Sequence, residues 1–392
     1  MPRRHFIPYE YPFRNETIKF IIDDQYDALG IINGGGQGHI IKAFDSSDQK
    51  IVAVKKIKQM NDPDNAKRVY REFVISRSVK HRNLITLLDT FAPADGSDLY
   101  LVYEYLDCSM RDLIRLPSTE PRQLHKMVWD PNSGDYFTAD VLFQLFCGLR
   151  YLHQEKLKFI HRDIKPENIL FKHMVGGNWS LKICDLGCAR HLRETDANVS
   201  AYIVTWPYRA PEVMIGEPYS FPIDLWSVGC VLAEMITGKI LFRREGGNQL
   251  DHLFRIFYLV GLPEKNRVIP DFIRAKLNNQ NQYGPNRIYE TFHDDVLPNW
   301  NHQRITKQFI RDLLKNLLEF NPNSRLTAEN AANLPHFNFL ENRSGINDIA
   351  QVEYNPVNED GFHTESEWRR FIREQLDDYE DKRFDNASNF NF

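Results

Sequence analysis

Residues 159–171 read Phe159-Ile-His-Arg-Asp-Ile-Lys-Pro-Glu-Asn-Ile-Leu-Phe171, and the rest of the chain is organised around them. Apolar residues at both ends predict two short buried strands with a polar loop between them. In that loop, Asp163 can orient a hydroxyl group and accept its proton, and Lys165 can neutralise charge that grows on a phosphate. Asn168 offers an amide oxygen, a ligand type that Mg²⁺ prefers. A lone Asp-x-Lys pair is usually a surface ion pair, but the whole spaced string indicates phosphoryl transfer to a hydroxyl.

Length and composition place further limits on the protein. The 392 residues exceed what one hydrophobic core usually fills, so we expect two lobes or domains. A hydrophobic content of 42% and a charged content of 26% are typical of a globular protein. The net charge of −4 argues against a general binder of nucleic acid or of membrane surfaces. The most apolar helical window, residues 225–242, carries Glu234 and Lys239, which favours a buried helix over a membrane span.

The termini and the cysteines indicate where the protein resides. No apolar segment follows Arg3-Arg4, so we do not expect a secretory signal. The five cysteines show no paired spacing, and Cys184-x-x-x-Cys188 is not a zinc pattern. Reduced thiols fit this arrangement, which predicts a protein of the cytoplasm and nucleus.

The first part of the chain reads as a small β-rich lobe, residues 20–106. Residues 1–19 are rich in proline, arginine and aromatic residues without a period, and we expect an irregular arm there. The lobe should hold one helix over residues 65–79, which starts after Asp62-Pro63. Strand-like runs cover residues 26–32, 40–44, 51–55, 84–91 and 99–103.

The pattern becomes helical from about residue 137, within a larger lobe over residues 107–345. The main helices are expected over residues 138–153, 224–237 and 305–320. Residues 117–135 are polar, contain two prolines and show no period, which suggests a surface insertion. Residues 346–380 form an extension with a helix over 364–379, and the Asn- and Asp-rich residues 381–392 a flexible tail.

A run of glycines lies between the first two expected strands. It reads Ile32-Asn33-Gly34-Gly35-Gly36-Gln37-Gly38-His39-Ile40. Glycines let backbone N–H groups approach anionic oxygens, and a strand–turn–strand setting suits a flap over a nucleotide. A glycine run alone is more often a flexible hairpin.

Two further charged residues have positions that suit phosphate chemistry. Lys55 ends an apolar strand, so its ammonium needs a partner if it points inward, and Glu72 on the following helix is the candidate. Asp185 follows another apolar strand and could bind a Mg²⁺ ion that bridges distal phosphates. In isolation, each of these could be a solvated surface charge.

Taken together, these motifs resemble those of protein kinases. His161-Arg162-Asp163 with Lys165 and Asn168 matches H-R-D-x-K-x-x-N, and Val52-Ala53-Val54-Lys55 is similar to V-A-I-K. Asp185-Leu186-Gly187 is similar to D-F-G, with leucine in place of phenylalanine. The resemblance implies an α+β fold of two lobes: a small β-rich N-lobe with one regulatory helix and a larger helical C-lobe. It also implies ATP and Mg²⁺ as cofactors.

The family pattern assigns roles to this chain's residues. Asp163, Lys165, Lys55 and Glu72 would be catalytic, and Asn168 and Asp185 would hold metal. Besides residues 32–40 and Lys55, the nucleotide would contact Ala53, Glu104, Leu106 and Leu170, with main-chain groups at the hinge after Tyr103 reading the adenine. The family has glycine at Asn33, and asparagine tolerates left-handed backbone angles, so we expect the turn to survive. Ser76 replaces a bulky apolar residue, and we expect the large Tyr103 to fill the space.

One stretch resembles the kinase branch that holds MAP kinases and cyclin-dependent kinases: Tyr208-Arg209-Ala210-Pro211-Glu212. In that family pattern, Arg325 would form an ion pair with Glu212. From residue 20 to about 378 the chain resembles stress-activated MAP kinases of the c-Jun N-terminal kinase type. The matching stretches include Asn65-Ala-Lys-Arg-Val-Tyr-Arg-Glu72 and His363-Thr-Glu-Ser-Glu-Trp368. The resemblance implies phosphorylation of serine or threonine followed by proline.

The segment after Asp185 carries Ser200-Ala201-Tyr202, where MAP kinases have T-x-Y. Ser200 and Tyr202 are the expected phosphorylation sites, and the resemblance supplies phosphate-binding arginines at positions 71, 162, 190 and 209 (Arg71, Arg162, Arg190 and Arg209). Trp206 stands where the family has a further arginine for phosphotyrosine. We therefore expect Ser200 to matter more than Tyr202. An upstream dual-specificity kinase and protein substrates are implied partners, as are phosphatases and proteins with docking motifs; nucleic acid and membranes are not.

Two alternatives remain at this stage. Asn33, Ser76 and Trp206 are compatible with a pseudokinase that serves as a scaffold, although every residue assigned a direct chemical role is present. Pro166-Glu167-Asn168 suggests a cyclin-dependent-like kinase, but the expected cyclin-binding helix sequence is absent and the triplet at residues 200–202 argues against it.

Overall fold

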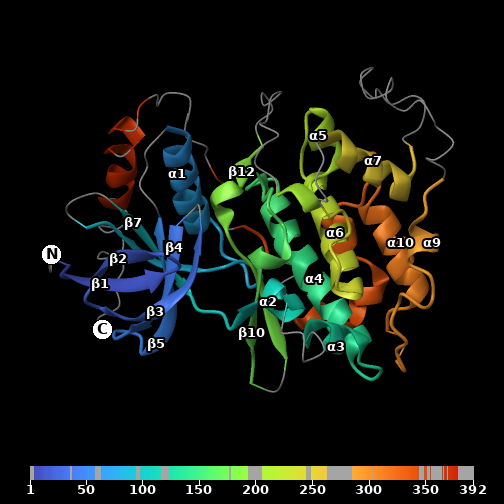
Figure 1. Cartoon of the computed structure of the whole chain (residues 1–392), viewed down its shortest axis with the longest axis horizontal. Helices are drawn as coiled ribbons and strands as arrows, with labels where there is room; N and C mark the ends of the chain where they lie inside the picture. The colour runs from blue at the N-terminus through green and yellow to red at the C-terminus, as the bar shows by residue number, and fades with distance from the viewer. Residues whose placement is uncertain are drawn as a thin grey trace. The chain divides into compact units, whose positions relative to one another are not determined.

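The computed structural model describes residues 4–35, 38–57, 63–93, 98–115, 123–175, 178–192, 205–243, 249–262, 285–302, 304–343, 348–350, 354, 364, 366–368 and 370–377. The chain folds into two units, shown in Figure 1. The small unit takes residues 1–80, 85–106 and 355–392, and the large unit takes residues 81–84 and 107–354. The small unit is therefore completed by the C-terminal part of the chain.

An antiparallel sheet of five strands forms the centre of the small unit, in the order β3-β4-β5-β7-β6. Its strands are β3 (Tyr26–Gly35), β4 (Gly38–Asp45), β5 (Lys50–Ile57), β6 (Leu87–Phe91) and β7 (Leu99–Glu104). Helix α1 (Pro63–Ser78) lies between β5 and β6 in the sequence. The five strands and the single helix confirm the sequence-based expectation.

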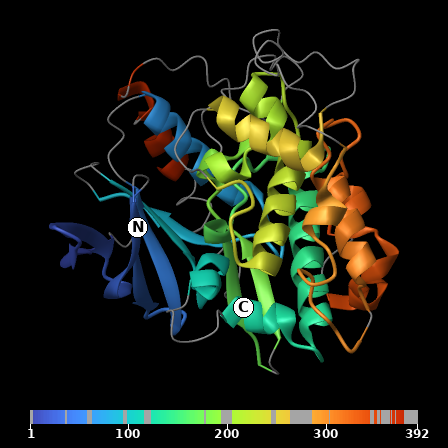
Figure 2. The same cartoon turned by 45° about the vertical axis from the view of Figure 1, so that its right-hand side comes forward.

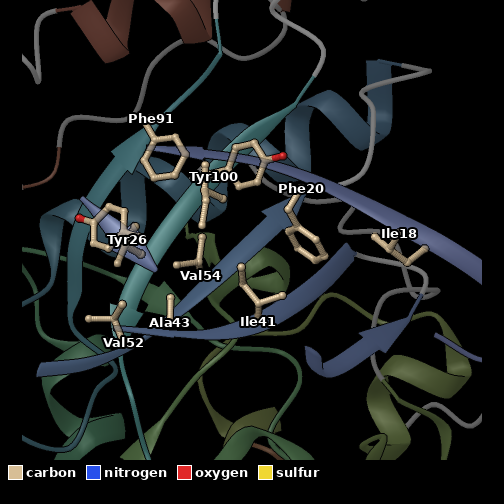
Figure 3. Close-up of a cluster of buried hydrophobic side chains, with 11 residues drawn as sticks. Ile18, Phe20, Tyr26, Ile41, Ala43, Val52, Val54, Phe91 and Tyr100 are labelled. Atoms are coloured by element: carbon tan, nitrogen blue, oxygen red, sulfur yellow. The ribbon is translucent and has the colours of Figure 1, made fainter. Parts of the chain in front are cut away.

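The two faces of this sheet differ because side chains alternate along each strand. One face carries Val52, Val54, Tyr100 and Val102 and belongs to a buried core, most of which Figure 3 shows as sticks. The core also takes Ile18, Phe20 and Ile22 from the N-terminal part of the chain. The opposite face carries the alternate residues of β5 and β7, among them Lys55 and Tyr103.

The expected irregular arm at residues 1–19 is wrong. Strands β1 (Phe6–Phe13) and β2 (Glu16–Asp23) form an antiparallel hairpin instead. Pro8 and Pro12 obscure the pattern, but β1 is an edge strand, where proline is tolerated because one side of the strand needs no ladder hydrogen bonds. On β2, Ile18, Phe20 and Ile22 alternate toward the core, and their burial stabilises the hairpin.

The C-terminal helix packs against α1. Residues 366–368 and 370–377 are helical, which agrees with the helix expected over 364–379. The ring of Tyr70 on α1 lies 5.4 Å from that of Trp368 and 5.1 Å from that of Phe371, measured between centroids. The Arg77 side chain donates to the Gln375 carbonyl at 3.3 Å. Both views show the two helices side by side (Figures 1 and 2).

The large unit is mainly helical. Helices α4 and α6 lie next to each other in its interior, and α10 packs on α6 (Figures 1 and 2). The helices expected over residues 138–153, 224–237 and 305–320 are confirmed as α4, α6 and α10. The unit's helices are α2 (Met110–Arg115), α3 (Gln123–Trp129), α4 (Gly134–His153), α5 (Pro211–Ile215), α6 (Pro222–Thr237), α7 (Gln249–Val260), α9 (Ile288–Thr291), α10 (Lys307–Leu317) and α11 (Ala328–Ala332).

The insertion expected at residues 117–135 contains helical structure. Residues 116–122 lie outside the described part of the chain, and residues 123–135 form α3, a turn and the start of α4. Val128 is fully buried, and the Trp129 indole N–H donates to the Ile236 carbonyl at 3.0 Å. A helix of seven residues is too short to show a period in the sequence. Helices this short are stabilised mainly by tertiary contacts, here those with α6.

The large unit also contains short strands and 3-10 turns between its helices. The strands are β8 (Cys108–Ser109), β9 (Phe159–Ile160), β10 (Ile169–His173), β11 (Trp179–Ile183) and β12 (Arg190–His191), and the 3-10 turns are η1 (Pro166–Asn168), η2 (Leu186–Cys188), η4 (Trp206–Tyr208) and η6 (Pro335–Arg343). Strand β10 lies between β11 and β8, and β9 pairs with β12. None of the helices that the structure describes is long and apolar enough to span a bilayer.

Candidate active site

The loop over residues 161–168 is held by its two flanking strands, β9 and β10, and by a buried carboxylate beneath it. Asp224 on α6 accepts hydrogen bonds from the backbone N–H groups of His161 at 2.8 Å and Arg162 at 2.9 Å. Its carboxylate also lies 2.9 Å from His153 Nε2. Burial opposes the charge of Asp224, but the hydrogen bond and charge of His153 lower its pKa below the usual value. Asp224 therefore fixes the backbone of the loop, which is a structural role.

Three side chains surround the Asp163 carboxylate. Lys165 Nζ lies 2.5 Å from its Oδ2, and Thr205 Oγ1 donates to its Oδ1 at 2.5 Å. Lys165 also donates to Thr205 Oγ1 at 3.1 Å, which closes a triangle. The side-chain amide of Asn168 donates to Asp163 Oδ2 at 3.0 Å. Asp163 is almost completely buried.

The charge on Lys165 depends on its acidic neighbours. Burial lowers the pKa of a lysine, but the Asp163 carboxylate outweighs it, with Asp185 and Glu167 adding to the effect. The net result is a pKa above the ordinary lysine value, so the ammonium form persists beside Asp163 and Asp185.

Asn168 and Asp185 are suited to hold a divalent cation. The Asn168 amide nitrogen donates to Asp163, and its Oδ1 is left as an oxygen ligand. Asp185 has φ 62° and ψ 68°, a left-handed conformation that is uncommon outside glycine and often found at functional sites. No group of three or more His, Cys, Asp or Glu side chains in the described ranges could hold a metal. Two oxygen ligands fit Mg²⁺, which commonly takes its others from phosphate and water.

Lys55 and Glu72 form the expected pair. Lys55 Nζ on β5 lies 2.5 Å from Glu72 Oε1 on α1, and both side chains are buried. The contact confirms the pairing; the catalytic role of the pair stays a prediction. Tyr103 lies 3.2 Å from Ser76, hydroxyl to hydroxyl, as expected if the tyrosine fills the space that the serine leaves.

The glycine run forms the end of the β3–β4 hairpin. Gly36 and Gln37 lie outside the described residues, Ile32 lies at a shift of register, and the others pair across the two strands. Asn33 is not left-handed, so the expected use of its tolerance for such angles is not needed. A Cβ atom on Gly34 would lie 2.8 Å from the Phe13 ring, which requires glycine there. Phe13 also contacts His39, with 5.4 Å between ring centroids.

The remaining candidate nucleotide residues fall in both units. Ala53 lies on β5, Glu104 ends β7, and the buried Leu106 follows it in the small unit. The Glu104 carboxylate accepts the Thr86 backbone N–H at 2.9 Å, and the Glu104 backbone N–H donates to the Thr86 carbonyl at 3.2 Å. Leu170 lies on β10 of the large unit.

The four candidate phosphate-binding arginines have different settings. Arg162 is buried and has a positive φ of 67°, and its Nε donates to the Cys188 carbonyl at 2.7 Å. Arg190 pairs with Ile160 across β12 and β9, directly beside the loop. Arg71 is buried on α1 of the small unit. Arg209 stacks on Trp206, with its guanidinium carbon 5.3 Å from the ring centroid.

The two expected phosphorylation sites, Ser200 and Tyr202, lie outside the described residues.

Trp206 has a second partner. Its indole N–H donates to His252 Nδ1 on α7 at 3.0 Å. Burial, followed by the charges of Arg255 and Arg209, lowers the pKa of His252 to about 4. A neutral imidazole accepts at Nδ1 only when Nε2 carries its proton, so the contact fits this pKa.

Several contacts could not be read from the sequence. Thr205 belongs to none of the motifs described above, yet its hydroxyl donates to the Asp163 carboxylate across 42 positions of the chain. The buried Arg111 donates to Glu234 at 2.5 Å and to the Tyr208 hydroxyl at 2.6 Å, tying α2 to the turn after Thr205. The expected Glu212–Arg325 pair is confirmed, with two contacts of 2.7 and 3.0 Å.

Comparison with known proteins agrees with this geometry. A family model described as protein kinase domain matches residues 26–337. Similar proteins include "Stress-activated protein kinase JNK" of Drosophila melanogaster, 32% identical over 92% of this chain and 93% of the relative. Its namesake from Suberites domuncula is also 32% identical, over 92% and 95%. "GLH-binding kinase 1" of Caenorhabditis elegans is 30% identical, over 96% and 94%.

Proposed function

The chain belongs to the protein kinase family, as a divergent serine/threonine kinase of the MAP kinase type, and from this premise we propose that it phosphorylates serine or threonine followed by proline. The observation that carries the proposal is the convergence of Lys165, Asn168 and Thr205 on the buried Asp163 carboxylate. A carboxylate held in this way has a fixed direction in which it can accept a hydroxyl proton.

The chain's own side chains divide the work of the reaction. Asp163 orients the substrate hydroxyl and accepts its proton. Lys165 stays charged and stabilises negative charge on the phosphoryl group, and Lys55, fixed by Glu72, binds the phosphates of ATP. Asn168 and Asp185 would hold Mg²⁺, which supplies positive charge against the phosphate oxygens when bound.

Regulation is the second part of the proposal. An upstream dual-specificity kinase phosphorylates Ser200 and Tyr202, and Arg71, Arg162 and Arg190 bind the phosphate on Ser200. Arg209 shapes a pocket that favours proline after the target residue, a role that the resemblance to MAP kinases implies for this position. Protein substrates with Ser-Pro or Thr-Pro sites, phosphatases and proteins with docking motifs are the partners of such an enzyme.

The test compares wild type with Asp163→Asn, before and after treatment with a dual-specificity activating kinase. Both receive MgATP with a Ser-Pro peptide or a Ser-Ala peptide. Loss of the base should lower the phosphorylation rate by roughly 10²- to 10⁴-fold while MgATP still raises the melting temperature. Equal rates on the two peptides would contradict the specificity for proline.

The same experiment tests the pseudokinase alternative, which Asn33, Ser76 and Trp206 motivate. A scaffold would bind MgATP without phosphorylating either peptide, and Asp163→Asn would then change nothing. The contacts around Asp163 favour turnover, because a binding module does not need three side chains to orient one carboxylate.

A further inference from the structure

A buried chain of hydrogen bonds connects four side chains in the small unit. Ser76 Oγ lies 3.2 Å from Tyr103 Oη, and that hydroxyl lies 3.3 Å from Glu72 Oε1. Lys55 Nζ contacts the same oxygen, Glu72 Oε1, at 2.5 Å. Each of the four residues is 8% exposed or less. The ion pair is therefore one end of a longer polar connection that no sequence motif indicates.

The carboxylate fixes the direction of this chain. Beside an ammonium, Glu72 is ionised and can only accept hydrogen bonds, so the Tyr103 hydroxyl must be the donor. Because a hydroxyl has one hydrogen, Ser76 must in turn donate to the Tyr103 oxygen. Each bond polarises the next in a buried chain, so the serine strengthens the bond from Tyr103 to Glu72.

The sheet and the helix bring these groups together. Lys55 pairs with Leu101 and Ala53 pairs with Tyr103 across β5 and β7, so Lys55 and Tyr103 are diagonal neighbours on one face of the sheet. Glu72 and Ser76 are four residues apart on α1, which places them on the same side of the helix. Tyr103 therefore links the sheet to both helix residues at once.

We propose that Tyr103, supported by Ser76, is a positioning residue that holds Glu72 against Lys55 and so sets the position of Lys55 for nucleotide. The inference rests on the proposed function and adds a reason for two departures from the family pattern. The serine, which is too small to pack like the usual apolar residue, is instead the donor that completes the chain. A nonpolar residue at position 103 would leave the Glu72 carboxylate with one donor fewer, and a nonpolar residue at position 76 would remove the donor to the Tyr103 oxygen.

The test uses Tyr103→Phe, which keeps the ring and removes the hydroxyl, together with Ser76→Ala and the double variant. Tyr26→Phe is the matched control, because it removes a buried tyrosine hydroxyl that donates to Asp89 at 2.8 Å in the same sheet. The measurements are the Michaelis constants for ATP and for a Ser-Pro peptide, the dissociation constant of a fluorescent ATP analogue with Mg²⁺, and the melting temperature.

We expect Tyr103→Phe to lower kcat/KM for ATP by roughly 5- to 30-fold and to weaken binding of the analogue, because a hydrogen bond to a charged group is lost. The KM for the peptide should not change. The double variant should be no worse than Tyr103→Phe, since Ser76 acts through the tyrosine. Tyr26→Phe should lower the melting temperature without changing either constant for nucleotide.

The outcomes separate this inference from the proposed function. If Tyr103→Phe behaves like Tyr26→Phe, the hydroxyl is merely structural and the inference is wrong. If the wild type binds the analogue but phosphorylates no peptide, the proposed function fails, and the ratio of dissociation constants still tests the positioning role. A wild type that binds no nucleotide overturns both.

Discussion

At Asp163, one buried carboxylate accepts hydrogen bonds from an ammonium, a hydroxyl and an amide. Each donor occupies a direction around the two oxygens, and together they restrict the rotation of the side chain. Thr205 is the least expected of the three, because it comes from an irregular segment in which spacing carries no information. Because it contacts both Asp163 and Lys165, Thr205 is part of the candidate active site.

His252 should produce a pH dependence of stability. Its pKa is about 4 in the folded protein and near 6.5 when unfolded, so the unfolded chain binds more protons between these values. The free energy of unfolding should then fall as pH drops from about 6.5 to 4, by up to about 1.4 kcal/mol for each unit, and should level off below that. Denaturant titrations of His252→Gln, which keeps an acceptor for Trp206, should show a shallower slope.

His302→Gln is the matched control for that measurement, because His302 lies on the surface. It should reproduce the wild-type slope. An unchanged slope in His252→Gln would show that the buried imidazole does not resist protonation.

The contact between Ser76 and Tyr103 predicts coupling between substitutions. Ser76→Met places a longer side chain where Tyr103 lies, and Tyr103→Met leaves a space behind the serine. Changing both residues should cost less stability than the sum of the single changes, with an interaction energy of roughly 0.5–3 kcal/mol. Additive losses in chemical denaturation would mean that the two side chains do not share their space.

Among the elements, α1 depends most on distant parts of the chain. It receives Tyr103 from the sheet on one side, and Trp368 and Phe371 from the C-terminal helix pack on its Tyr70. Its own sequence is only weakly apolar, so tertiary contacts rather than helix propensity stabilise it.

Trp368→Ala should therefore remove a contact that stabilises α1. The indole is almost fully buried, and its removal should cost about 3–5 kcal/mol of stability. Hydrogen exchange followed by mass spectrometry should show faster exchange over residues 66–78 than in wild type. Phe339→Ala, which truncates an exposed ring in the large unit, should leave this exchange unchanged. Protection of α1 that survives Trp368→Ala would contradict the dependence on the C-terminal helix.

The segment with Ser200 and Tyr202 leads to a prediction about its two hydroxyls. Trp206 stands where the resemblance predicts an arginine for phosphotyrosine, and its indole instead donates to His252 while Arg209 stacks on its ring. Ser200→Ala should lower the activity of the activated protein by roughly tenfold or more, because new hydrogen bonds between phosphate and arginine no longer form. Tyr202→Phe should cost less. Peptide phosphorylation after activation measures both, and the reverse order would make the ranking wrong.

Over the whole molecule, sequence reasoning succeeded where chemistry requires fixed spacing. Residues 159–171, the strand that carries Lys55 and the helix that carries Glu72 all follow from patterns within short windows. It failed where prolines hid a regular element, as in the hairpin of β1 and β2. It also could not find contacts between irregular segments, such as Thr205 with Asp163, or a side-chain link such as Tyr103 with Glu72, because their partners lie 42 and 31 positions apart.

The small unit is assembled from both ends of the chain, and this has a consequence during synthesis. Arg77 and its partner Gln375 are 298 positions apart, and a ribosome adds roughly 5–20 residues each second. The C-terminal helix that packs on α1 is therefore synthesised roughly 15–60 s after α1 itself. During that interval α1 lacks the contacts that Trp368 and Phe371 make with the ring of Tyr70.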